Sequence, residues 1–117
     1  MLAVDVYELS VDLATGVRDL DFVAALDRYL TALQADGRIE RWRLLRSKLG
    51  LGARSEFKVL IETRDLAQLD AAFAVVSTRA DPIEEFHHGV NSLVTNFDAA
   101  LWRDFPDPQR VSGQERF

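Results

Sequence analysis

Apolar residues in this chain recur first at every second position and then at every third or fourth position. The order in which these two spacings follow each other restricts the folds that the chain can adopt. In residues 5–13 the spacing is two, because Tyr7, Leu9 and Val11 alternate with polar or charged residues. Such an alternation is typical of a strand that is buried on one face. After a Thr-Gly break, apolar residues recur every three or four positions, which predicts a helix over residues 20–35.

The rest of the chain repeats this succession of strand and helix. The segments RIERWRLLR and EFKVLIET predict two strands joined by a glycine-containing hairpin turn. Asp65 is expected to cap a second helix, and Asp81-Pro82 predicts the start of a third, shorter helix. A last alternation, in TNFDAALWRDF, predicts a fourth strand with Phe97 and Leu101 packed against the helices.

The predicted order is therefore strand, helix, strand, strand, helix, short helix, strand. Two right-handed strand–helix–strand units in this order form a ferredoxin-like sandwich, an α+β fold of the βαββαβ type. We expect a four-stranded antiparallel sheet with the helices on one face and an extra short helix before the last strand. A single domain would cover residues 1–105, and residues 106–117 would form a polar C-terminal tail.

The composition argues against several classes of protein. The 117 residues carry a formal net charge of −5, whereas binding to nucleic acid or to an anionic membrane favours a basic surface. The chain has no cysteine, so no disulfide or zinc–thiolate site is expected. The N-terminal segment lacks the basic residues of a signal peptide, and no apolar run approaches the ~20 residues of a membrane span. We therefore expect a cytoplasmic protein.

The second face of the predicted sheet would carry no helix. It combines charges of both signs with apolar residues, which fits either a solvated surface or contact with a second copy of the chain. Paired copies would enclose a cavity for a small organic ligand, an anionic one included, since arginine offers two parallel donors to a carboxylate or phosphate. The same charges also fit a protected edge strand and simple salt bridges. The ligand-binding candidates on this face are Glu8, Arg43, Lys58, Glu62 and Trp102.

Several segments of the chain resemble those of a known family. They are VRDLDFV, DGRIERWRLLRSKLG, RDLAQLDAAF and VNSLVTN with the later LWRDFPD. Together they extend from about Asp5 to Asp107. The chain resembles a small bacterial family of unknown function among the dimeric α+β barrel proteins, whose ferredoxin-like subunits pair through their sheets. The resemblance implies a homodimer. The wider group includes cofactor-independent monooxygenases, isomerases, dye- or haem-processing enzymes and ligand-sensing domains, but none of these segments is a catalytic signature.

The two histidines of the chain, His87 and His88, are adjacent. Neighbouring helical residues point about 100° apart, so the two cannot bind one metal as an i, i+4 pair does, and no metal site is expected. His88 would lie on the polar side, where Glu84 or Glu85 can pair with it. His87 lies at the edge of the apolar stripe, where an imidazole acts as an acid or base or simply packs at the core boundary. His87 is therefore the candidate catalytic residue.

Two kinds of function remain open at this point. The first is a small-molecule binding protein or cofactor-independent enzyme that uses a cavity in a homodimeric α+β barrel. The second is a non-catalytic ligand-sensing or protein-interaction module whose working unit is the dimer. A cavity lined by Glu8, Arg43, Trp102 and His87 would favour the first, and a fully packed sheet interface would favour the second.

Overall fold

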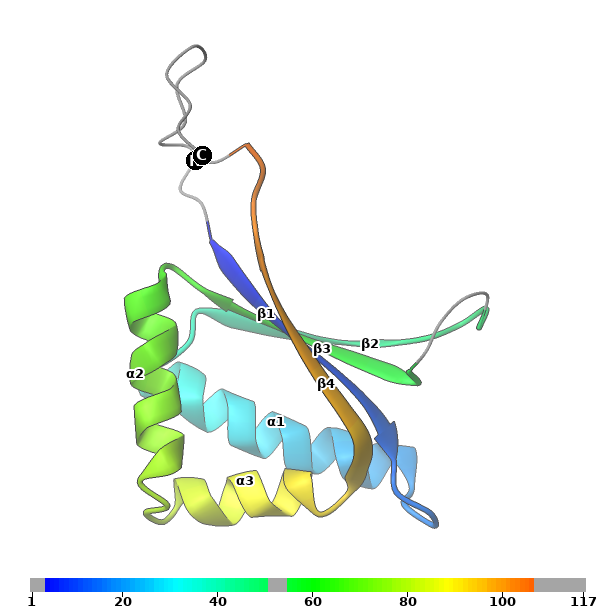
Figure 1. Cartoon of the computed structure of the whole chain (residues 1–117). Coiled ribbons are helices and arrows are strands. Elements are labelled where there is room, and N and C mark those ends of the chain that lie inside the picture. The colour runs from blue at the N-terminus through cyan, green and yellow to red at the C-terminus, as the bar shows by residue number, and fades with distance from the viewer. Residues whose placement is uncertain (1–3, 51–54, 107–117) are drawn as a thin grey trace.

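The computed structural model of the chain describes residues 4–50 and 55–106 and contains four strands and three helices (Figure 1). Their order is the one predicted from the sequence, including the short helix before the last strand. The predicted polar tail, apart from Pro106, lies outside the described residues. The elements are β1 (Asp5–Leu13), α1 (Asp19–Ala35), β2 (Arg41–Arg46), β3 (Phe57–Thr63), α2 (Leu66–Ser77), α3 (Ile83–Asn91) and β4 (Val94–Arg103).

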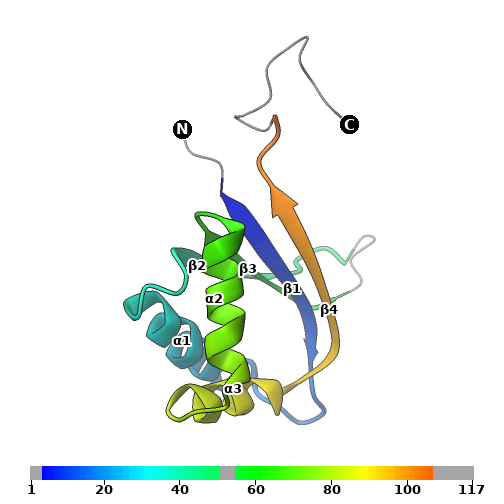
Figure 2. The ribbon, with the colours of Figure 1, turned by 60° about the vertical axis from the view of Figure 1, so that its left-hand side comes forward.

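The four strands form one antiparallel sheet in the order β2-β3-β1-β4. All three helices lie on the same face of this sheet, as Figures 1 and 2 show from two directions. This arrangement confirms the ferredoxin-like α+β fold predicted from the order of the elements. Among residues 4–50 and 55–106, no helix or second sheet covers the other face of the sheet.

The strand register assigns each residue of the sheet to one of its two faces. Tyr7 pairs with Ile61 and Leu9 with Val59, and these side chains face the helices. The residues between them point to the open face, because successive side chains of a strand alternate. The faces that the sequence alternation assigned to β1 and β3 are therefore confirmed.

The hydrophobic core lies between α1 and the central strands of the sheet. Phe22, Leu30 and Val59 are at most 2% exposed. The ring of Phe22 packs against the ring of Phe57, with 5.1 Å between their centroids. Burial of such side chains contributes roughly 1.5–3 kcal/mol each to the stability of a fold. The core therefore packs α1 against β1 and β3.

Asp65 caps α2, as the sequence predicted. Its carboxylate accepts a hydrogen bond of 2.8 Å from the backbone N–H of Gln68. The side chain of Gln68 in turn accepts a bond of 2.8 Å from the backbone N–H of Arg64 and donates one of 3.0 Å to the carbonyl of Gly37. These bonds satisfy donors that a helix start leaves free, and they tie α2 to the end of α1.

The outer strand β4 departs from the sequence prediction. Its register against β1 shifts between Ser10 and Asp12, where Asn96 adopts a positive φ of 54° and donates a 2.9 Å hydrogen bond to Asp12. Such a bulge bends and twists a strand. Phe97 and Leu101 remain 59% and 50% exposed. Both side chains lie on the sheet face that bears the helices, as predicted, since Leu101 pairs with Tyr7 and Phe97 borders the space between the helices and the sheet. They stay exposed because the helical layer covers the part of the sheet beside β4 (Figure 2).

Candidate functional site

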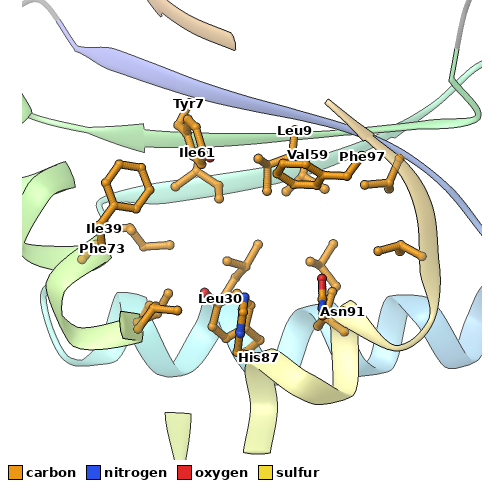
Figure 3. A pocket seen from close by; sticks show the side chains of 18 of the residues that line it. Tyr7, Leu9, Leu30, Ile39, Val59, Ile61, Phe73, His87, Asn91 and Phe97 are labelled. Atoms are coloured by element: carbon orange, nitrogen blue, oxygen red, sulfur yellow. The ribbon is translucent and has the colours of Figure 1, made fainter. Parts of the chain in front are cut away.

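A cavity of about 260 Å³ lies between the three helices and the sheet (Figure 3). Its walls are almost wholly apolar, with Leu9 and Val59 on the sheet side and Leu30 and Phe73 on the helix side. A concave, apolar space of this kind is the usual form of a small-molecule site.

Four of the side chains that line this cavity are polar, and they come from three different elements. Tyr7 belongs to β1, Tyr29 to α1, and His87 and Asn91 to α3. His87 and Asn91 are four residues apart and therefore lie on the same face of α3. Figure 3 shows both side chains pointing from the helix toward the sheet. We call these four residues the polar group of the cavity.

No other residue within 4–50 and 55–106 forms a hydrogen bond with the side chains of this polar group. The one sealed side-chain oxygen without a partner in these ranges is that of Thr63, which does not line the cavity. The two tyrosine hydroxyls are thus not closed off in the core. Tyr7, Tyr29 and His87 are half-buried and Asn91 is exposed, so a molecule that enters the cavity can reach their free donors and acceptors. A few polar groups of this kind beside a concave apolar space are the usual composition of a ligand site.

His87 is half-buried, whereas His88 is exposed. The ring of His87 packs against the ring of Tyr29, with 5.4 Å between the centroids. The structure therefore places His87 at the edge of the apolar stripe, as its helical phase indicated. For His88, the predicted ion pair with Glu84 or Glu85 is absent from the part of the chain that the structure describes.

Both tyrosines of the cavity hold their protons more strongly than a tyrosine in water. Burial, together with the charge of a neighbouring Tyr7, raises the pKa of Tyr29 to about 12. Burial also raises the pKa of Tyr7. A phenol that stays protonated keeps its hydrogen-bond donor throughout the physiological pH range.

This pKa predicts a loss of stability at alkaline pH. The folded chain retains the Tyr29 proton up to about pH 12, whereas an unfolded tyrosine loses it near pH 10.0. The free energy of unfolding is therefore unaffected by the titration of this tyrosine below pH 10. It falls by roughly 2–3 kcal/mol as the pH rises toward 12, because the unfolded chain loses the proton first. Urea unfolding at pH 9, 10 and 11 should show a steeper decline for the wild type than for Tyr29→Phe. Identical slopes would contradict the assignment.

The other predicted site residues lie on the open face of the sheet. Lys58 forms an ion pair of 3.0 Å with Glu8 and a hydrogen bond of 3.1 Å with Ser10. Glu62 pairs at 3.3 Å with Arg41, not with Arg43 or Lys58.

Arg43 and Trp102 differ from these paired residues. Arg43 has no ion pair with any other described residue. Trp102 is 57% exposed. Both side chains are therefore available to a molecule that approaches the open face.

The structure does not bring His87 together with Glu8, Arg43, Lys58, Glu62 and Trp102. The sheet separates His87 from these five side chains, none of which lines the cavity. Tyr29 and Asn91 were not among the site residues predicted from the sequence. Their helical spacing could have indicated them. Tyr29 lies three residues after the buried Leu26, and Asn91 lies four residues after His87, so each shares a helix face with that residue.

Within residues 4–50 and 55–106, no group of three or more histidine, aspartate or glutamate side chains is arranged to hold a metal ion. No helix in these ranges combines the length and apolar composition needed to cross a membrane.

Residues 4–117 match a sequence family described as "Family of unknown function (DUF6614)". The chain belongs to this family. No curated protein matches the sequence. The fold, however, is shared with several proteins of known structure, and these show what kinds of protein the DUF6614 chain resembles in three dimensions.

Three solved structures illustrate the range of these similarities. SnoaB, a cofactor-independent oxygenase from Streptomyces nogalater, matches with a TM-score of 0.67 and 12% identity over 94% of this chain and 100% of its own. A hydroxynitrile lyase from Passiflora edulis has a TM-score of 0.64 and 6% identity over 89% and 95% of the two chains. A dimeric ferredoxin-like protein of unknown function from Jannaschia sp. CCS1 has a TM-score of 0.63 and 10% identity over 85% and 97%. At these identities the shared property is the fold.

Proposed function

We propose that the protein binds a small organic molecule in the cavity between its helices and its sheet and acts on it without a cofactor. The observation that carries this proposal is the polar group of Tyr7, Tyr29, His87 and Asn91, which faces an apolar cavity without partners among the described residues. Apolar walls supply affinity, and a few polar groups fix the orientation of the ligand.

The size of the cavity limits the size of the ligand. An engineered protein cavity of about 150 Å³ is large enough for benzene, and sites for drug-sized molecules begin near 300 Å³. The 260 Å³ of this cavity fall between these two values. We therefore propose a ligand of one or two rings, or an aliphatic molecule of similar volume.

His87 is the residue that we propose for proton transfer. An imidazole accepts and returns a proton near neutral pH, and such general acid–base catalysis typically contributes 10²–10⁴-fold to a rate. The ring of His87 is held in place by the ring of Tyr29 and borders the cavity. Two proteins of similar fold support chemistry of this class, since one is a cofactor-independent oxygenase and the other a hydroxynitrile lyase.

We propose further that the working unit is a homodimer formed through the open face of the sheet. Two proteins of similar fold are described as dimeric. The open face carries Val6, Leu60 and the exposed Trp102, which a second copy would cover. Arg43, unpaired in the described chain, would then find its acidic partner on the second copy.

A cavity-blocking substitution tests the proposed binding site. Val76 lines the cavity from α2, so Val76→Trp is expected to fill the space and abolish binding of small aromatic compounds. In the wild type, a compound at 100 times its Kd should stabilise the fold by about 2.7 kcal/mol, which a thermal melt detects. Ala74→Trp, on the exposed side of the same helix, is the control and should keep the ligand-dependent increase in Tm. An increase that persists in Val76→Trp would refute this cavity as the site.

A further inference from the structure

The two tyrosines of the cavity face it from opposite walls. Tyr7 extends from β1 in the sheet, and Tyr29 extends from α1 in the helical layer. Neither hydroxyl has a hydrogen-bond partner among the described residues, and neither is sealed off in the core. The cavity is therefore bordered by two free phenolic donors that a ligand between the walls can reach.

Packing of the two rings restricts where these donors point. The ring of Tyr7 meets the ring of Phe73 edge-on, with 5.2 Å between centroids and 82° between planes. The ring of Tyr29 packs against His87 at 5.4 Å. Since aromatic contacts of this kind restrict ring orientation, the two hydroxyls are arranged before a ligand arrives.

The charge of the cavity selects against ions. Among the described residues that line it there is no arginine, lysine, aspartate or glutamate. Moving an unpaired carboxylate or ammonium group into such an apolar space costs several kcal/mol.

We infer that the ligand is a neutral molecule with a hydrogen-bond acceptor oxygen, such as a carbonyl, and that the hydroxyls of Tyr7 and Tyr29 bind this oxygen. The inference rests on the proposed binding function and adds to it the chemical class of the ligand. Tyr7 and Tyr29 are then specificity-determining residues, distinct in role from the proton-transferring His87.

Three probes that share a naphthalene ring separate this inference from its alternatives. The ketone 2-acetylnaphthalene carries a neutral acceptor, 2-isopropylnaphthalene has a similar shape without one, and 2-naphthoate is an anion. Binding of each is measured by calorimetry at pH 7. The proteins are the wild type, Tyr7→Phe, Tyr29→Phe and the cavity-blocking Val76→Trp.

We expect each Tyr→Phe change to weaken binding of the ketone by about three- to tenfold, as the loss of one hydrogen bond does. The hydrocarbon should bind these variants as tightly as the wild type or more tightly, and the naphthoate should bind weakest of the three. Both variants should fold normally, because each removes a hydroxyl that has no partner in the described chain.

Two results would overturn the inference while leaving the proposed binding function intact. One is a ketone affinity that neither Tyr→Phe change alters, although Val76→Trp abolishes binding. The other is tightest binding of the naphthoate, which would assign the cavity to an anion held by His87. Equal binding of all three probes to the wild type and to Val76→Trp would refute the proposed site itself, and the inference with it.

Discussion

Replacing His87 with phenylalanine is expected to lower turnover of the protein's substrate by about 10²–10⁴-fold while the chain folds normally. The phenyl ring preserves packing against Tyr29 and removes both imidazole nitrogens, so the change isolates proton transfer from ring packing. The expected loss is the usual contribution of a positioned general acid or base. The measurement is the steady-state rate on a substrate found by screening the wild-type protein, with Tm recorded in parallel.

His88→Phe is the matched control for this experiment. It makes the same chemical change one residue away, on an exposed position of α3 that does not line the cavity. We expect its rate to stay within about twofold of the wild type. Equal losses in both variants would mean that the histidines act through the stability of α3, and His87 would no longer be a catalytic candidate. A ligand that binds without being turned over would favour the ligand-sensing function instead.

Replacing Trp102 with glutamate is expected to convert a homodimer into monomers. Trp102 is 57% exposed on the open face of the sheet, beside Val6 of β1. Covering the exposed part of a tryptophan contributes roughly 2–4 kcal/mol per chain before the entropy cost of association. A glutamate at the same position would replace this gain with the cost of burying a charge.

Sedimentation equilibrium at micromolar concentration measures this effect. The wild type should have twice the 13.2 kDa mass of one chain, and Trp102→Glu should have the single mass. Leu101→Glu is the control, because Leu101 is 50% exposed on the same strand but points to the face that bears the helices. A monomeric wild type would refute the dimer, and dissociation by Leu101→Glu alone would place the interface on the other side of β4.

The fold was predictable because strand and helix periods are local properties of the sequence. The alternation around Tyr7, Leu9 and Val11 assigned these residues to the face that packs on the helices, and the register confirms it. The helical phase of α3 likewise distinguished the half-buried His87 from the exposed His88. In each case the period alone decides which side of an element a residue occupies.

The exposure of β4 was not predictable in this way. A bulge at Asn96 interrupts the register, and the alternation on either side of it still looks regular in the sequence. Whether Phe97 and Leu101 are covered depends on how far the helical layer extends across the sheet. The extent of the helical layer depends on how segments far apart in the sequence pack together, and no local sequence pattern reports it.

The cavity also depends on packing that the sequence does not encode locally. The apolar stripes of three helices indicate a core, and a gap within that core arises only from how far the helices lie from the sheet. For this reason no local pattern groups Tyr29 with Tyr7 and Asn91, which come from three different elements. The predicted site likewise grouped His87 with Glu8 and Trp102, although the sheet separates His87 from both side chains.

The cavity between the helices and the sheet is the ligand site that we propose. A crystal structure of the protein with 2-acetylnaphthalene tests it most directly. We predict that the naphthalene ring will lie between Leu9 and Leu30, with the ketone oxygen within hydrogen-bond distance of the hydroxyls of Tyr7 and Tyr29. A probe bound instead on the open face beside Arg43 and Trp102, with the cavity free of it, would contradict the claim.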